Sequence, residues 1–318
     1  MTYRTATSST LTSARARAFP WQVSFLLLAA IWGCSFWWIK LGLRSFSPVD
    51  VAFGRLAVGA VALVVICGLT RSRLPRQRST WGRLFVLAIL LNSAPFTLFA
   101  YGETHVSAVL AGIINALTPV AALLMVLAVF REEHPSAERI GGLVLGFTGV
   151  LVVVGVWNGL GSGELLGVGA LLGAVTCYGI GFPYARRHLT GLPEGPVALA
   201  TGQVLCGALQ LLPFAVLSGH VHAHIASASV SGMLGLGILG SGVAYILNFH
   251  VVSRTGGATA STVTYLTPVF AVVVGAAFLG EPVTWYEPVG GLVILAGAAL
   301  SQGGIPALSK RRRPLVDN

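Results

Sequence analysis

The sequence predicts an all-α integral membrane protein with ten transmembrane helices, arranged as two inverted repeats of five helices. Three observations lead to this prediction: ten long apolar segments, arginines concentrated in alternate loops, and an internal repeat. The chain has 318 residues, of which 55% are hydrophobic and only 9% are charged, whereas a soluble domain has about 25% charged residues. A soluble core of this size could not hide so much apolar surface, so lipid is the expected solvent.

The apolar segments give the expected spans, because a transmembrane helix needs about 20 mostly apolar residues. The segments that meet this requirement are residues 22–41, 49–69, 84–101, 106–130, 140–157, 165–185, 197–217, 229–251, 256–279 and 288–304. Strands are not expected, since polar and apolar residues do not alternate. The first segment is long, rich in tryptophan and followed by others like it, so we interpret it as an uncleaved span rather than a signal peptide.

The spans divide the chain into four parts. Residues 1–20 are rich in Ser, Thr and Arg and are expected to form a disordered cytoplasmic tail. Residues 21–157 form the first repeat and residues 164–304 the second. Residues 305–318 form a basic tail that is expected to contact anionic lipid headgroups.

The distribution of basic residues predicts the orientation. Cytoplasmic loops of membrane proteins carry an excess of Lys and Arg. If the N-terminus is cytoplasmic, all 20 lysines and arginines lie in cytoplasmic segments except Lys40, Arg44 and Arg55. We therefore expect a multi-pass protein of the cell inner (plasma) membrane with both termini in the cytoplasm.

An internal repeat relates the two halves. Residues 111–119 (AGIINALTP) resemble residues 260–268 (ASTVTYLTP), 149 positions later. The same offset pairs Glu132 with Glu281 and Gly141-Gly142 with Gly290-Gly291, and a slightly shorter one pairs Trp32-Gly33 with Tyr178-Gly179. Because five is an odd number of spans, the second half must be inverted in the membrane. Inverted repeats are typical of secondary transporters; a duplicated scaffold that transports nothing is the alternative.

These motifs are similar to those of the EamA family of the drug/metabolite transporter superfamily. The resemblance rests on WGCSFWWIK near the start, the paired LTP triplets and the paired acid-then-Gly-Gly pattern, and it covers residues 22–304. It implies two EamA-type repeats. It also implies export or exchange of a small metabolite, such as an amino acid or a related compound. An exchanger of phosphate-ester anions is the second substrate class, although it would need several inward-facing cations.

Arg55 is the main candidate for a solute-binding residue. It lies within the second expected span, where an unpaired charge costs at least about 2.5–3.5 kcal/mol on insertion scales. It could therefore face a polar cavity and hold a carboxylate or another anion. The alternative is that Arg55 extends to the membrane surface and pairs with Asp50.

Other candidates are aromatic and polar residues inside the expected spans. Trp32, Tyr178 and Tyr265 could line a cavity for an amphipathic solute, or could be packing residues. The polar candidates are Asn92, Asn115, Thr118 and Asn248, with hydrogen bonding between helices as the alternative role. Pro119 and Pro268 occupy equivalent positions and predict kinks that either free backbone carbonyls for gating or are only static.

Energy coupling is not readable from the pattern of acidic residues. Glu103 ends the third expected span beside His105 and could take part in proton coupling; the simpler interpretation is a solvated loop carboxylate. Glu132 and Glu281 could act in gating or in loop geometry. Without a secure carboxylate relay inside the helices, facilitated diffusion or exchange is favoured over proton-driven export.

Several other classes of function are disfavoured. The string Leu239-Gly240-Ser241-Gly242 lacks the first glycine of a rhomboid protease motif, and HExxH and GxxxxGK[ST] are missing, so no enzyme is expected. No cofactor or metal site is expected either, because His220, His222 and His224 have no acidic or cysteine partner nearby. The expected partners are a small-molecule solute and the lipid bilayer, not nucleic acid. A homo-oligomer is compatible with the sequence.

Overall fold

The ten predicted spans form a single helical bundle. The computed structural model describes residues 20–125, 127–128, 137–159, 161–189, 191–218, 225–255 and 263–301. Within these residues, eight helices are long and apolar enough to cross a membrane, and the shorter apolar helices Val263–Leu279 and Tyr286–Leu300 complete the ten. The all-α fold class is thus confirmed. The expected tails at both ends fall outside the described residues, apart from Pro20.

The first repeat contains two simple spans followed by two interrupted ones and a fifth. Its elements are α1 (Trp21–Leu43), α2 (Pro48–Leu69), α3 (Arg78–Ala88) continued by the π-helical η1 (Ile89–Ser93) and α4 (Ala94–Glu103), α5 (Ala108–Asn115) followed by α6 (Thr118–Met125), and α7 (Ala137–Val154). The start of α2 shows why these residues form a helix. Ser47 accepts a hydrogen bond from the N–H of Asp50, and Pro48 occupies the first turn, where its missing N–H costs nothing.

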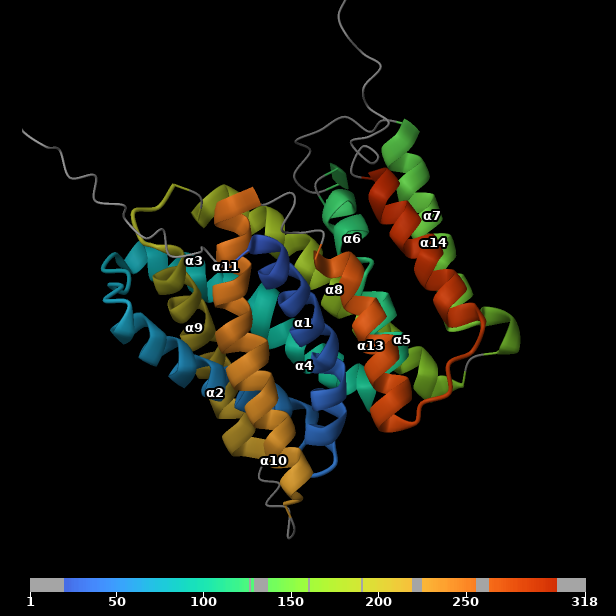
Figure 1. Ribbon diagram of the computed structural model, residues 1–318, viewed down its shortest axis with the longest axis horizontal. Coiled ribbons are helices and arrows are strands. Elements are labelled where there is room, and N and C mark those ends of the chain that lie inside the picture. Colours follow the sequence, from blue (N-terminus) through green and yellow to red (C-terminus); the bar gives the residue numbers. More distant parts are fainter. Residues whose placement is uncertain are drawn as a thin grey trace, which may run out of the picture.

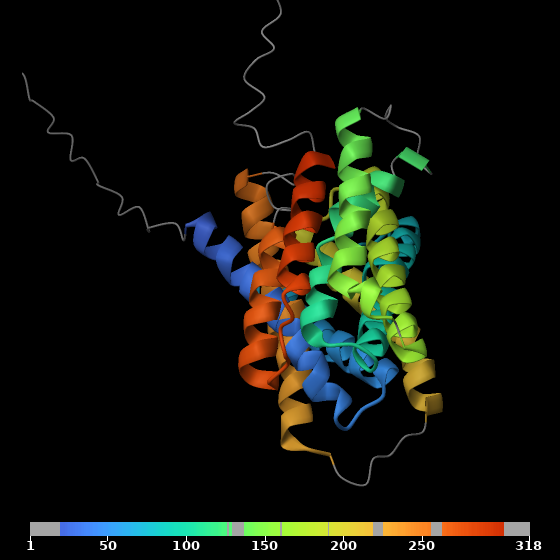
Figure 2. The ribbon, with the colours of Figure 1, turned by 90° about the vertical axis from the view of Figure 1, so that its right-hand side faces the viewer.

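The second repeat has the same plan. Its elements are α8 (Ser162–Leu189), α9 (Pro196–Ser218), α10 (Ser227–Leu234) continued by the π-helical η4 (Gly235–Val243) and α11 (Ala244–Thr255), α13 (Val263–Leu279) and α14 (Tyr286–Ser301). In Figure 1, α1 runs from the upper end of the bundle to the lower end, whereas its counterpart α8 runs from the lower end to the upper end. The helix α1 begins, and α14 ends, at the upper end (Figures 1 and 2).

Two predicted spans differ from the structure. The segment 106–130 is not one helix, since a turn at residues 116 and 117 separates α5 from α6. The segment 140–157 ends as an α-helix at Val154, because Gly155 adopts a left-handed conformation with φ of 63°. A short 3-10 turn, η3 (Val156–Asn158), follows.

Helix packing follows an approximate two-fold relation between the repeats. The helix α2 packs against its own counterpart α9, and α7 packs against its counterpart α14. The helix α1 packs against α13 of the second repeat, and α8 packs in the same way against α6 of the first. Each first helix of a repeat therefore contacts the fourth span of the other repeat.

Equivalent glycines make these crossings close. A side chain at Gly33 in α1 would meet Phe270 and the carbonyl of Thr267 in α13. A side chain at Gly179 in α8 would meet the backbone of Ala121 in α6, at 2.9 Å. Ala121 and Phe270 are 149 positions apart, so the sequence repeat is also a repeat of contacts. Small residues allow such close approach of membrane helices.

The glycines of two GxxxG motifs, Gly142 with Gly146 and Gly169 with Gly173, differ in how closely they pack. Gly142 and Gly146 of α7 lie against Gly297 of α14, where an added methyl group would come within 2.5 Å of a backbone nitrogen. By contrast, no atom lies within 4 Å of the position that a side chain at Gly169 would take. Gly169 therefore forms no close contact of this kind with a described residue.

Candidate functional site

Arg55 lies in the interior of the bundle, on the face of α2 that meets η4 and α4. Only 9% of its surface is exposed. Its Nε donates to the hydroxyl of Ser241 at 3.3 Å, and its guanidinium carbon lies 3.8 Å from the centre of the Phe96 ring. The phenols of Tyr178 and Tyr245 are near enough to interact with it electrostatically. The prediction that Arg55 turns inward agrees with this geometry.

The alternative partner of Arg55, Asp50, is engaged elsewhere. Its carboxylate accepts hydrogen bonds from the hydroxyls of Ser47 at 2.7 Å and Ser218 at 3.1 Å. Among the described residues no Asp or Glu forms a salt bridge with Arg55, and Ser241 is its one hydrogen-bond acceptor. A guanidinium has five N–H donors in a rigid fork, so most of the donors of Arg55 remain available to a bound anion.

A second polar group lies across the centre, in η1 and α9. Gln203 of α9 donates from Nε2 to the Oδ1 of Asn92 at 2.5 Å, and Asn92 donates from Nδ2 to the hydroxyl of Tyr245 at 3.3 Å. Asn92 is fully buried and Gln203 is nearly so. Next to them, Ser93 donates to the amide oxygen of Gln210 at 2.5 Å. These neutral groups hold η1 against α9.

The two polar groups are counterparts in the repeat. Residues 51–63 (VAFGRLAVGAVAL) align with residues 199–211 (LATGQVLCGALQL), which places Arg55 opposite Gln203. The offset of 149 places Asn92 opposite Ser241. Thus Arg55 bonds to Ser241 in η4, while its counterpart Gln203 bonds to the counterpart of Ser241 in η1. The arrangement is symmetric in position but asymmetric in charge.

Each of the two polar groups includes one residue of a π-helical segment. In a π-helix the backbone hydrogen bond runs from i to i+5, which bulges the helix and is frequent at functional sites. The segment η1 carries Asn92, and η4 carries Ser241. Glycines in the facing helices accommodate the bulges: Gly59 of α2 lies against Ser241, and its counterpart Gly207 of α9 lies against Asn92.

Of the predicted aromatic residues, only Tyr178 joins this centre. Its ring packs on Phe99 at 5.9 Å between centroids. Trp32 instead packs beside an apolar cluster formed by Leu28, Ala29, Ala244 and Val263. Tyr265 packs against the large core cluster, and its buried hydroxyl has no hydrogen-bond partner among the described residues.

The remaining predicted polar residues lie on α5, α6 and α11, and within the described residues none of them is hydrogen-bonded to Arg55. Asn115 and Thr118 do not share a helical face, since α5 ends at Asn115 and α6 begins at Thr118. The Thr118 hydroxyl donates to the main-chain carbonyl of Asn115 at 2.7 Å. Asn248 is half-buried in α11. Direct solute contact by these residues stays a prediction.

The two equivalent prolines have different local structures. Pro119 is the second residue of α6 and sits just after the helix break. Because proline lacks an N–H, it cannot bond to the carbonyl of Asn115 four positions earlier; the Thr118 hydroxyl takes that carbonyl instead. Pro268 lies inside the continuous helix α13. A gating role for either proline stays a prediction.

Two sets of side-chain contacts involve the segment 103–109, one within the first repeat and one between the repeats. The ammonium group of Lys40 in α1 donates to the carbonyls of Glu103 at 2.6 Å and Val106 at 2.7 Å. The carboxylate of Glu281 accepts from the N–H groups of Ala108 at 2.9 Å and Val109 at 3.0 Å. An acid at the N-terminus of a helix is stabilised by the exposed N–H groups and by the helix dipole. We call these contacts the Lys40 latch and the Glu281 cap.

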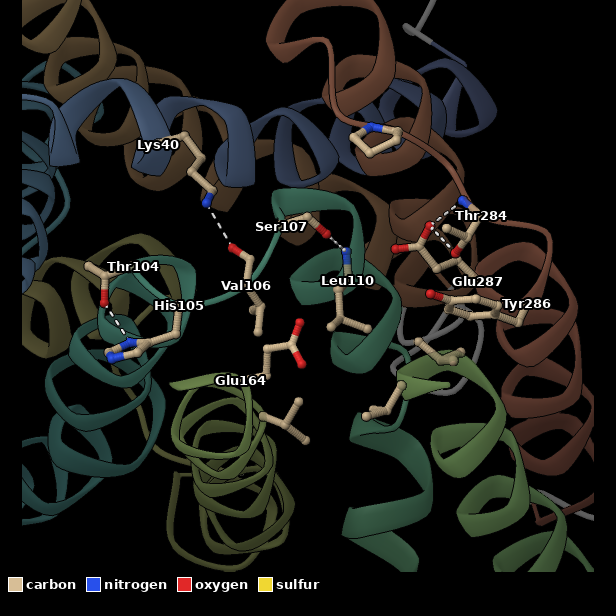
Figure 3. A pocket seen from close by; sticks show the side chains of 14 residues that line it. Lys40, Thr104, His105, Val106, Ser107, Leu110, Glu164, Thr284, Tyr286 and Glu287 are labelled. Atoms are coloured by element: carbon tan, nitrogen blue, oxygen red, sulfur yellow. Dashed lines mark hydrogen bonds between the residues drawn. The ribbon is translucent and has the colours of Figure 1, made fainter. Parts of the chain in front are cut away.

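A pocket of about 380 Å³ opens beside the Lys40 latch. Figure 3 shows Lys40 extending from α1 towards the turn that holds Thr104, His105 and Val106. The pocket is lined by Lys40, Thr104, His105, Val106, Ser107, Leu110, Val153, Val154, Glu164, Val168, Pro282, Thr284, Tyr286 and Glu287. None of the predicted solute-binding residues lines it. Lys40, Glu164 and Glu287 give charged groups to a lining that is otherwise partly apolar.

The acidic residues near this pocket show one clear error of sequence interpretation. Glu103 is not a solvated loop carboxylate, because it is only 1% exposed and is the last residue of α4. Glu132, the counterpart of Glu281, lies outside the described residues, as do His220, His222 and His224. Within the described parts of the chain, no group of three His, Cys, Asp or Glu side chains could hold a metal ion.

Sequence reasoning missed Phe96, Gln203, Ser241 and Tyr245, and the part played by Lys40. A signal for Gln203 was present in the paired glycines Gly54 and Gly202, and Gly59 and Gly207, which align α2 with α9. The 149-residue offset, applied to Asn92, would have identified Ser241 as its counterpart. The Phe96 contact depends on side-chain orientation, which no spacing rule predicts.

Known proteins resemble this chain over most of its length. The profile of the EamA-like transporter family matches residues 19–155 and again residues 165–302. The "Uncharacterized transporter YdfC" of Bacillus subtilis (strain 168) is 25% identical over 91% of this chain and 93% of its own length. The "Probable terminal-alkyne amino-acid exporter" of Streptantibioticus cattleyicolor is 29% identical over 87% of this chain and 91% of its own.

A solved crystal structure supports the fold. It superimposes with a TM-score of 0.61 at 14% sequence identity, over 88% of this chain and 96% of the other. Two matches to one family profile, one in each half, agree with the duplicated architecture, and the relatives are named as transporters. The chain belongs to the EamA-like transporter family and is a multi-pass membrane transporter rather than an enzyme.

Proposed function

We propose that this protein moves a small carboxylated metabolite, an amino acid or a related compound, across the inner or plasma membrane by alternating access. The direction is export or exchange, and both termini lie in the cytoplasm. The name of the Streptantibioticus relative supports the solute class, and the excess of arginines in alternate loops supports the orientation. Two inverted repeats around a polar centre give two related states, each open to one side.

The observation that carries this proposal is the environment of Arg55. A guanidinium keeps its charge in proteins, and placing it within a membrane span is costly unless it faces a polar space or a partner. Ser241 and the Phe96 ring supply one hydrogen bond and one cation–π contact. A carboxylate can accept two parallel N–H bonds from the same guanidinium. A carboxylated solute would therefore complete the site.

A single buried cation fits a carboxylate better than a phosphate ester. A phosphate group carries up to two charges and three acceptor oxygens. Lys40, a second cation of the first repeat, is committed to two main-chain carbonyls. The counterpart of Arg55 is the neutral Gln203. The polar centre would thus bind a solute with one anionic end and one hydrogen-bonding end.

The test is counterflow in proteoliposomes, with an equimolar mixture of radiolabelled L-amino acids outside and unlabelled amino acids inside. Wild-type protein is expected to accumulate label, and an absence of uptake would favour the scaffold alternative. Arg55→Gln should lower counterflow at least about tenfold, since a hydrogen bond to a charged group is worth about 1.5–3 kcal/mol. Arg55→Lys should be intermediate, because it keeps the charge but loses the fork.

The matched control is Arg44→Gln, which removes an exposed arginine just after α1. It should transport at the wild-type rate. Equal counterflow by wild type and Arg55→Gln would remove Arg55 from the site and contradict the proposal.

A further inference from the structure

Glu103 is a buried carboxyl group that the proposed solute site does not use. Its side chain is only 1% exposed, and neither carboxylate oxygen has a hydrogen-bond partner among the described residues. Buried polar groups are nearly always hydrogen-bonded, and an unpaired buried charge is strongly disfavoured. A carboxyl group in this position is stable when it carries a proton and is neutral.

The Lys40 latch connects the pocket with the segment that carries this carboxyl group. Lys40, Thr104 and Val106 line the pocket, whereas Glu103, the residue just before Thr104, does not. The ammonium group of Lys40 bonds to the main-chain carbonyls of Glu103 and Val106 and leaves the Glu103 carboxylate oxygens unbonded. Movement of Lys40 away from these carbonyls would open the carboxyl group to water in the pocket.

The charges around Glu103 come from several elements. Lys40 on α1, Arg55 on α2 and Glu281 from the segment after α13 interact with it electrostatically. From α8, Tyr178 packs on Phe99 one turn before Glu103, and Glu164 lines the adjoining pocket. The charged groups that interact with Glu103 are therefore of both signs. None of them donates a hydrogen bond to its carboxylate. The interaction with Arg55 places Glu103 in the same interior as the proposed solute site.

We propose that Glu103 is a proton-binding site that couples solute transport to the proton gradient. The inference rests on the proposed function, because it requires a transported solute. With the latch open, the Glu103 carboxylate takes a proton from water and an O–H bond forms. The latch then closes over the neutral acid. When the opposite end of the bundle opens, the acid returns its proton to water, so that one proton crosses against one solute molecule.

From the sequence, exchange is favoured over proton-driven export, and Glu103 has two interpretations: proton coupling or, more simply, a solvated loop carboxylate. The burial of Glu103 excludes the solvated interpretation. The carboxyl group is buried in this structure, and the proposed opening of the latch would give it a second, wet environment. A titratable group that alternates between such environments links protonation to conformation.

The test separates driven transport from exchange. Proteoliposomes receive the radiolabelled L-amino-acid mixture either under an imposed pH gradient or in counterflow without a gradient. Wild type should show both. Glu103→Gln is nearly the same shape and always neutral, so counterflow should stay near the wild-type rate while uptake driven by the pH gradient is lost. A pH-sensitive dye inside the vesicles should report solute-dependent proton movement with wild type and none with Glu103→Gln.

Two further variants complete the design. Glu103→Asp should retain driven transport, because it keeps an ionisable carboxyl group. Glu164→Gln removes the carboxylate that lines the pocket and should behave as wild type in both assays. Driven uptake by Glu103→Gln equal to wild type would overturn the proposal, and so would loss of its counterflow, since a residue that only carries the proton is not needed for exchange. Failure of wild-type counterflow would instead reject the proposed function.

Discussion

At the scale of single residues, polar side chains inside the spans divide into two kinds. Asn92 and Gln203 satisfy each other with a bond between η1 and α9. Arg55 and Glu103 are ionisable residues. Among the described residues, the Arg55 side chain has one hydrogen-bond partner and the Glu103 carboxylate has none. The first kind fixes the distance between helices. The second kind has binding capacity left for a solute or a proton.

Replacing Asn92 with alanine tests its structural role. The change removes the bonds to Gln203 and Tyr245. Hydrogen bonds between membrane helices average about 0.6 kcal/mol and reach about 1.7 kcal/mol, so a loss of about 1–2 kcal/mol in the free energy of unfolding is expected. Unfolding by SDS titration in mixed micelles, followed by circular dichroism, measures this loss.

Asn115→Ala is the matched control for this measurement. Asn115 is only half-buried, and its side chain takes part in a single long contact with Thr118 at 3.5 Å. A loss of stability as large as that of Asn92→Ala would show that the Asn92 bonds carry no special weight.

Candidate site residues could be chosen from the sequence by residue type, but the side chains that they contact could not be predicted. The cost of burying Arg55 in lipid indicates a functional role from the sequence alone. Asn92 and Tyr178, which sequence reasoning also selected, lie at the same polar centre. Trp32 and Tyr265 were grouped with Tyr178 by residue type alone; Trp32 packs beside a separate cluster, whereas Tyr265 packs against the same large core cluster as Tyr178. Which face of a helix meets which neighbour depends on the packing of the whole bundle.

At the scale of elements, spans are easier to predict than their interruptions. Hydropathy averages over a whole helix, so it locates a span without seeing a change of hydrogen-bond register inside it. The segments η1 and η4 are π-helical, and α5 is separated from α6 by a turn. Pro119 indicated the turn between α5 and α6 from the sequence. The π-helical segments follow from the facing glycines Gly59 and Gly207, which lie far away in sequence.

The contact between α7 and α14 gives a test at this scale. A methyl group at Gly297 would lie 2.5 Å from the nitrogen of Gly146 and 2.8 Å from the carbonyl of Gly142. Because these are backbone atoms, the helices must separate to admit it. Gly297→Ala should therefore lower the midpoint of thermal unfolding in detergent, despite the better helix propensity of alanine, worth up to about 1 kcal/mol.

The same change at Gly169 provides the comparison. No atom lies within 4 Å of the methyl group that would be added to this glycine of α8. Gly169→Ala should leave the midpoint unchanged or raise it. If both variants melt at the same temperature, the close packing of α7 on α14 is not what stabilises this pair.

At the scale of the whole molecule, the repeat organises every other feature. The internal repeat and the odd number of spans per half predicted an inverted pair, and the packing of α1 on α13 and of α8 on α6 shows the corresponding contacts. The asymmetry lies in the side chains, since the position equivalent to Arg55 in the second repeat holds Gln203. On the proposed function, exchange between two similar states would come from the symmetric backbone, and selectivity from the unlike residues. The sequence motifs alone could predict the first but not the second.

The most direct test of the account is the distance across each end of the bundle, measured by pulsed electron paramagnetic resonance in lipid. The four native cysteines are free and would first be replaced, with counterflow retained. Spin labels at exposed positions would then report on each end: Thr104 with Trp285 beside the Lys40 latch, and Arg186 with Arg254 at the opposite end. Adding amino acids should widen one end while the other narrows. A transporting protein in which both distances stay fixed, or widen together, would contradict alternating access.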